Sequence, residues 1–200
     1  MSRTSEKQSD DQVIQRCLDG ETEAFGELVL KYQNRLFSAV SNAFGHQTEA
    51  EDVVQETFVQ AFTKLASFRS ESSFYTWLYR IAFNTSISRN RRKRPTVSVE
   101  QSREVFGREP QGSDEDPRDE LERKERAVEV HAALQRISDE HRSILVLREI
   151  EDMDYEAISQ VLDLPIGTVR SRLHRARLQL RTELERMPVK NVAEHDTSEH

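Results

Sequence analysis

Apolar side chains recur every three or four residues through most of this chain, and this spacing constrains the fold more than any other feature. It is the period of one face of an α-helix. Three such segments occupy the first half, at about residues 25–44, 48–65 and 74–94, and the period returns from about 121 to 187. No segment shows the sustained alternation of a half-buried strand. The sequence therefore predicts an all-α protein.

Residues 95–119 interrupt this pattern. The segment PTVSVEQSREVFGREPQGSDEDPRD is rich in Pro, Gly, Ser and acidic residues and has few side chains to bury. Such a composition is typical of a flexible linker. We therefore predict two small helical domains, at residues 1–94 and 120–187, that are joined by an acidic flexible linker at 95–119 and followed by a disordered tail at 188–200.

The composition excludes several classes of protein. No apolar run approaches the ~20 residues that a membrane-spanning helix needs, and the N-terminal segment lacks a signal-peptide core. We therefore expect a cytoplasmic chain without direct membrane insertion. Cys17 is the single cysteine and the six histidines show no ligand spacing, so we expect no metal and no cofactor. The chain has no phosphate-binding glycine loop and no triad pattern, which predicts no enzyme, no catalytic residue and no small-molecule substrate.

Charge is segregated along the chain, although the net charge is −7. Pro165–Arg186 contains six arginines and two glutamates, whereas Arg148–Asp163 contains one arginine and six acidic residues. A second basic stretch, RNRRKR, occupies Arg89–Arg94. Local fields rather than the total charge decide which partners approach a surface. Binding to nucleic acid is therefore compatible with the negative net charge.

The segment DYEAISQVLDLPIGTVRSRLHRARLQLRTEL carries the signals of a helix-turn-helix. Asp154 can cap a short helix, and Asp163 stands where a tight turn needs a residue that tolerates left-handed geometry. Pro165 favours the first turn of a second helix. In a helix-turn-helix protein this second helix enters the major groove of DNA.

The second helix has one apolar stripe and a basic, polar face. At about 100° per residue, four side chains point away from the apolar stripe and are candidates for base edges: Thr168, Ser171, His174 and Arg175. Arg170 and Arg172 flank the stripe and suit phosphates. The alternative is a solvated basic face on a packing helix.

The helix expected at Thr48–Leu65 has a second stripe beside its apolar one. This stripe repeats at helical spacing and combines two acids, an amide and an apolar side chain: Asp52, Gln55, Glu56 and Val59. An acid-rich helix face is often only solvated, and the residues alone do not distinguish that reading from a docking surface.

The next helix follows a short polar loop, Arg69–Ser73. Its apolar stripe contains Phe74, Trp77 and Ile81, and five residues project elsewhere: Tyr79, Arg80, Phe83, Asn84 and Ile87. Aromatic rings among basic and amide side chains suit a single DNA strand, because bases stack on rings while cations hold the backbone. The alternative is that the rings of Tyr79 and Phe83 pack against neighbouring helices.

Three long motifs together resemble the extracytoplasmic-function (ECF) sigma factors, small two-domain members of the sigma-70 family. They are AEDVVQETFVQAF at 50–62, FRSESSFYTWLYRIAFNTSISRNRRKR at 68–94 and DYEAISQVLDLPIGTVRSRLHRAR at 154–177. The resemblance covers about 85% of the chain. It implies a protein that binds RNA polymerase core, directs it to particular promoters and helps to melt them. The alternative is a helix-turn-helix regulator that binds duplex operators alone.

The resemblance also implies roles for individual residues. The docking face on the clamp helices of the largest polymerase subunit would be Asp52, Gln55, Glu56 and Val59. The −10 element would be contacted by Arg69, Ser70, Ser72, Phe74, Tyr79, Arg80, Phe83, Asn84 and Arg91. The −35 element would be contacted by Thr168, Arg170, Ser171, Arg172, His174 and Arg175. The implied partners are polymerase core, promoter DNA and an anti-sigma factor.

Three positions depart from the family pattern. Ile137-Ser138 replaces a common Leu-Pro, and Asp152 replaces a common turn glycine. Asp tolerates the left-handed conformation that such a turn requires. Ser70 replaces a frequent glycine in the melting loop, which leaves open the geometry of this loop and its preference for the −10 sequence.

Overall fold

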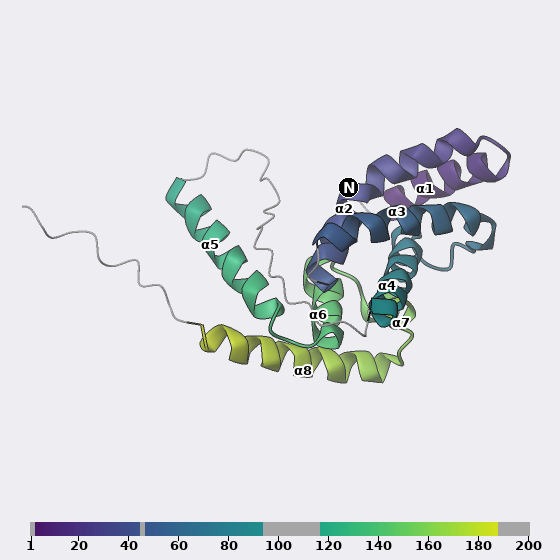
Figure 1. Cartoon of the computed structure of the whole chain (residues 1–200). Helices are drawn as coiled ribbons and strands as arrows, with labels where there is room; N and C mark the ends of the chain where they lie inside the picture. Colours follow the sequence, from purple (N-terminus) through teal and green to yellow (C-terminus); the bar gives the residue numbers. More distant parts are fainter. Residues whose placement is uncertain (1–2, 45–46, 94–116, 188–200) are drawn as a thin grey trace, which may run out of the picture.

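The computed structural model describes residues 3–44, 47–93 and 117–187, and every regular element in these ranges is helical (Figure 1). The first unit contains α1 (Arg3–Leu18), the turn η1 (Thr22–Ala24), α2 (Phe25–Phe44), α3 (Gln47–Thr63), the turn η2 (Leu65–Ser67) and α4 (Phe74–Lys93). The second contains α5 (Pro117–Leu134), α6 (Asp139–Leu145), the π-helical turn η3 (Val146–Ile150), α7 (Tyr155–Leu162) and α8 (Ile166–Glu185). The all-α prediction is confirmed.

The predicted linker is shorter at its C-terminal end than the composition suggested. Helix α5 begins at Pro117, inside the range assigned to the linker. Proline is well tolerated at the start of a helix, because its missing N–H would be unpaired there in any case. The remainder of the linker and the predicted tail at 188–200 lie outside the described residues.

Apolar stripes of α2, α3 and α4 form the core of the first unit. Leu36 of α2, Ala61 of α3 and Leu78 of α4 are fully buried, and each of the three helices contacts the other two. Burying one leucine side chain contributes about 1.5–3 kcal/mol. The predicted apolar stripe of each helix thus contributes to this core, although α4 is also buried on a second side.

Helices α7 and α8 form the predicted helix-turn-helix. The Asp154 carboxylate accepts a hydrogen bond from the backbone N–H of Ala157 at 2.8 Å. Asp163 ends α7 with φ 53° and ψ 50°, which is the left-handed conformation. Helix α8 then begins directly after Pro165. The local signals in the sequence therefore produce the turn that they predicted.

Two departures from the family pattern have a local structural role. Ser138 is the N-cap of α6, and its hydroxyl accepts a hydrogen bond from the His141 backbone N–H at 3.4 Å. Asp152 has a φ of 49°, in the left-handed region that a glycine would otherwise occupy. Ser138 thus caps its helix, and Asp152 tolerates the left-handed conformation of its turn.

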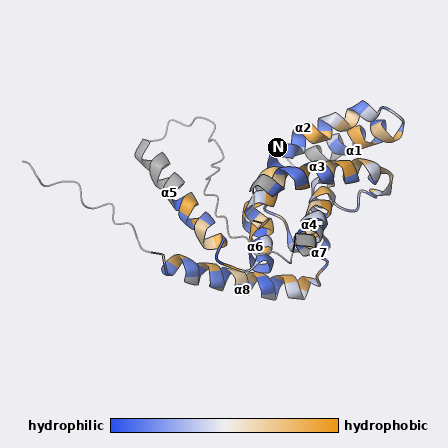
Figure 2. Cartoon of the chain, viewed as in Figure 1, coloured by the Kyte–Doolittle hydropathy of each residue, from blue (hydrophilic) through white to orange (hydrophobic). Residues whose placement is uncertain are grey.

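The two units are packed against each other. Helix α6 contacts α2, and α7 contacts α4, so α6 and α7 lie between α8 and the first unit (Figure 1). Buried residues of both units belong to one continuous cluster. Hydrophilic residues extend along much of α8 (Figure 2). None of the described helices combines the length and the apolar character that a membrane crossing requires.

Candidate polymerase and DNA interfaces

The acidic stripe of α3 lies on the surface. Asp52 and Gln55 are exposed, Glu56 is half-buried, and the Val59 side chain is 66% exposed. On the other side of the helix, Val54 and Phe58 are buried in the core. The structure thus brings the four predicted docking residues together on one accessible face of α3, with an apolar side chain at one end.

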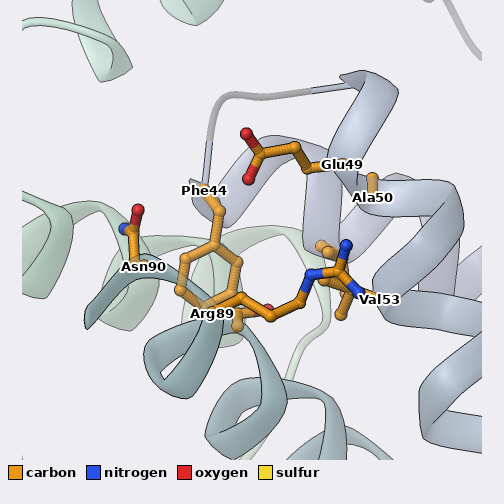
Figure 3. Close-up of a pocket in the computed structure, with 8 residues that line it drawn as sticks. Phe44, Glu49, Ala50, Val53, Arg89 and Asn90 are labelled. Carbon is orange, nitrogen blue, oxygen red and sulfur yellow. The ribbon is translucent and has the colours of Figure 1, made fainter. Parts of the chain in front are cut away.

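Arg89 of α4 binds both acids of this face. Its Nη2 donates to Asp52 Oδ2 at 2.7 Å, and its Nη1 donates to Glu56 Oε2 at 3.2 Å. The side chain reaches α3 beside Phe44 and Val53 (Figure 3). One guanidinium therefore neutralises one of the two negative charges on the face. In the sequence, Arg89 stands out only as part of a basic stretch, because no sequence signal links residues 33 to 37 positions apart.

The loop expected to read the −10 element is exposed and has one unusual residue. Arg69 and Ser70 are exposed, and Ser72 is half-buried. Ser70 has a φ of 53°, a backbone conformation that residues other than glycine rarely adopt. Its hydroxyl donates to Asp11 Oδ1 at 3.1 Å. The serine thus takes a left-handed conformation that glycine adopts most readily, and its hydroxyl is hydrogen-bonded there.

Helix α4 begins at a serine cap that was not among the predicted features. The Ser73 hydroxyl accepts a hydrogen bond from the Thr76 backbone N–H at 3.0 Å. Trp77, one turn further, is partly buried, with its ring 5.3 Å from that of Phe68 and 5.7 Å from that of Phe74. These contacts fix the end of the loop on the helix. The sequence signal for this cap was a serine, Ser73, at the end of a serine-rich loop.

Two aromatic residues predicted to contact DNA are buried. Phe74 is 1% exposed, in the core stripe, and Tyr79 is fully buried. The prediction that Tyr79 projects away from the core is wrong, because α7 of the second unit packs against α4 and covers this side. Burial and the nearby Glu151 carboxylate raise the pKa of Tyr79 above its ordinary value.

Other predicted −10 residues differ in accessibility. Phe83 is half-buried, with its ring 5.8 Å from that of Phe44, which corresponds to the packing alternative. Arg80 and Asn84 are exposed. Arg91 belongs to α4, but its side chain lies outside the described residues. The accessible part of this region is therefore polar rather than aromatic.

The predicted face of α8 points into solvent. Arg170, Ser171, His174 and Arg175 are exposed. Thr168 and Arg172 are half-buried, and Arg172 Nη1 lies 3.4 Å from the Glu140 carboxylate. The opposite stripe, with Val169, Leu173 and Ala176, is buried. The orientation derived from 100° steps therefore agrees with the packed helix.

No metal centre is evident in the described ranges: no three or more His, Cys, Asp and Glu side chains there form a group that could hold an ion. Cys17 is buried.

Comparison with known proteins assigns both units. Residues 28–96 match the family model of sigma-70 region 2, and residues 120–180 match that of sigma-70 region 4. The chain is 39% identical to the RNA polymerase sigma-H factor of Pseudomonas aeruginosa, over 86% of this chain and 91% of that protein. It is 36% identical to the ECF RNA polymerase sigma-E factor of Escherichia coli K12, over 86% of this chain and 93% of that protein.

Solved structures show the same fold. CnrH in complex with the cytosolic domain of CnrY is 26% identical, covers 86% of this chain and 95% of its own, and has a TM-score of 0.61. The sigma factor RpoE of Bartonella quintana, in complex with the anti-sigma factor NepR, is 24% identical, covers 83% and 99%, and has a TM-score of 0.66. The chain belongs to the sigma-70 family and is an ECF sigma factor, a protein of promoter-directed transcription initiation.

Proposed function

We propose that this sigma factor binds RNA polymerase core through α3, reads the −10 element with loop 69–73 and α4, and reads the −35 element with α8. The observation that carries the proposal is the orientation of two helices. The acidic stripe of α3 and the basic stripe of α8 both face solvent, while their opposite faces are buried. One chain thus presents an acidic surface for a protein and a basic surface for duplex DNA.

In the docking part of the proposal, the clamp helices of the largest polymerase subunit contact Asp52, Gln55, Glu56 and Val59. A basic partner surface would compete with Arg89 for the two carboxylates, since each already accepts a hydrogen bond from it. Released from these bonds, Arg89 would add a cation at the end of α4 that carries the basic stretch. Core binding and strand binding would then favour each other.

In the −10 part, the accessible polar side chains carry the contacts. These are Arg69, Ser70, Ser72, Arg80 and Asn84, followed along α4 by Arg91. Phe74 and Tyr79 have no such role in this proposal, because both are buried. Strand recognition would therefore depend on hydrogen bonds and cations more than on stacking.

If α8 reads the −35 element, removal of the Arg175 side chain should weaken promoter binding. Replacing Arg175 with alanine should weaken promoter binding by the holoenzyme by about 1–3 kcal/mol, or roughly 5- to 150-fold, if the guanidinium binds a base edge. Binding to polymerase core should not change. The measurement is the dissociation constant of the holoenzyme on a promoter duplex. Arg186→Ala, at the far end of the same helix, is the matched control. Wild-type affinity of Arg175→Ala would contradict the orientation of α8.

Further partners and properties follow from this role. The proposed partners are polymerase core, promoter DNA and an anti-sigma factor. The chain would act in the cytoplasm, where polymerase and chromosome lie, and would catalyse no reaction of its own and use no cofactor. The test is reconstitution with core polymerase on genomic DNA of the source organism. We expect transcript starts that require this chain and share two spaced sequence elements; no chain-dependent start would contradict the proposal.

A further inference from the structure

Glu151 joins the two units although it belongs to the second. Arg35 Nε of α2 donates to Glu151 Oε2 at 2.9 Å, and Tyr75 Oη of α4 donates to the same oxygen at 2.9 Å. Arg35 Nη2 lies 3.4 Å from the Glu151 backbone oxygen. The Arg35 guanidinium also lies over the Tyr75 ring, 4.0 Å from its centroid. The donors are 116 and 76 residues away from Glu151 in sequence.

These bonds exist only while the units are docked. The Glu151 side chain is 5% exposed, and a buried carboxylate is stable only when charges and donors compensate for the lost water. Glu151 receives this compensation from the other unit, next to Met153, which is also buried. Separation of the units would return the carboxylate to water. The pairing therefore specifies how the units are docked, in addition to their apolar contact.

The docked arrangement places acidic residues opposite the −10 loop. A cleft of about 330 Å³ lies along the junction of the units. Glu71, Ser72 and Ser73 of the loop region line it together with residues of the other unit, among them Asp154, Glu156 and Gln160. The described lining residues include five carboxylates and a single cation, Arg35. A DNA strand that approached Ser72 would meet this negative field.

In the docked arrangement, the chain is also too short to reach both promoter elements at once. Elements named −10 and −35 lie about 25 base pairs apart, or roughly 85 Å at ~3.4 Å per pair. A compact chain of this length is roughly 40 Å across. The exposed face of α8 can meet duplex DNA in this form, but the −10 loop cannot reach its element at the same time.

We propose that Glu151, Arg35 and Tyr75 form a latch that holds the free chain in a closed, autoinhibited form, which polymerase core must open. The closed form leaves the −35 face accessible and places the −10 loop beside acidic residues of α7. The inhibitory consequence rests on the proposed function, whereas the latch itself is a property of the free chain.

The test is a distance measurement between the units by double electron–electron resonance. Spin labels replace exposed Ser38 of α2, one turn from Arg35, and exposed Gln160 of α7, in a Cys17→Ala background. With the latch residues unmodified, the two labels should give a single narrow distribution of short distances. Glu151→Gln removes the charge and keeps the shape, and should shift the closed-to-open ratio by at least about tenfold, since bonds to charged groups are among the strongest.

Two further variants make the test specific. Glu149→Gln removes a nearby acid that pairs with Arg177 of its own unit at 2.7 Å, and it should leave the short distance unchanged. Tyr75→Phe removes one donor and keeps the ring, and should open the chain partly. If Glu151→Gln and Tyr75→Phe both retain the closed distance with native circular dichroism, the latch is overturned.

Addition of core polymerase separates the two proposals. A shift of the wild-type chain to long distances supports the autoinhibited form. A chain that binds core and keeps the short distance would overturn autoinhibition. A chain that fails to bind core would contradict the proposed function, while the distances in the free variants would still decide on the latch.

Discussion

Lysine in place of both Asp52 and Glu56 should abolish co-purification of the chain with RNA polymerase core. The proposed partner surface is basic, and like charges that meet at an interface cost several kcal/mol. The change also leaves Arg89 beside two cations in place of the two carboxylates that it now binds. Folding should survive, because both positions lie off the buried stripe of α3. The measurement is affinity capture of core by the tagged chain, with circular dichroism for the fold.

Two controls separate docking from total charge. Lysine in place of exposed Glu23 and Glu129 produces the same change in net charge away from α3 and should preserve core binding. Arg89→Ala removes the ion pairs of both acids and should preserve or tighten core binding, most clearly at low salt. Normal capture of core by the Asp52→Lys, Glu56→Lys variant, with a native helical spectrum, would remove the docking assignment.

The helix-turn-helix could be predicted because its signals are local. Asp154, Asp163 and Pro165 each act on backbone within a few residues, so their consequences do not depend on the rest of the fold. The buried face of α8 followed from helical period alone, since α5, α6 and α7 pack against it and the opposite face is exposed. The residues predicted to contact the −35 element lie on the opposite, exposed side of the helix.

The surroundings of α4 could not be predicted in the same way. This helix is covered by α3 on one side and by α7 on another, so it has two buried faces where the period of the sequence suggested one. Tyr79 lies under the second of these. The contacts of Arg89 and Glu151 join residues that are 33 to 116 positions apart. No periodic pattern encodes such pairs, because they depend on how whole helices dock.

Promoter opening is the second large effect, and we expect it only in the presence of polymerase. Unstacking costs a few kcal/mol per base step, and one stacking partner returns about 1–3 kcal/mol. The burial of Phe74 and Tyr79 leaves the free chain with fewer rings for stacking than the sequence suggested. The net charge of −7 further weakens attraction to phosphate. The free chain therefore has too little binding energy to hold several open base pairs.

On a promoter located by transcript mapping, the purified chain should produce no permanganate-reactive thymines, and addition of core should produce them. Asn84→Ala should reduce this reactivity and leave capture of core unchanged, because Asn84 is exposed on α4 and does not belong to the docking face on α3. Asn34→Ala, an exposed asparagine on α2, is the matched control and should melt the promoter normally. Reactive thymines with the free chain at moderate salt would mean that binding energy within the chain itself opens DNA. That result would favour a regulator that acts on DNA alone over a sigma factor that opens promoters only with polymerase.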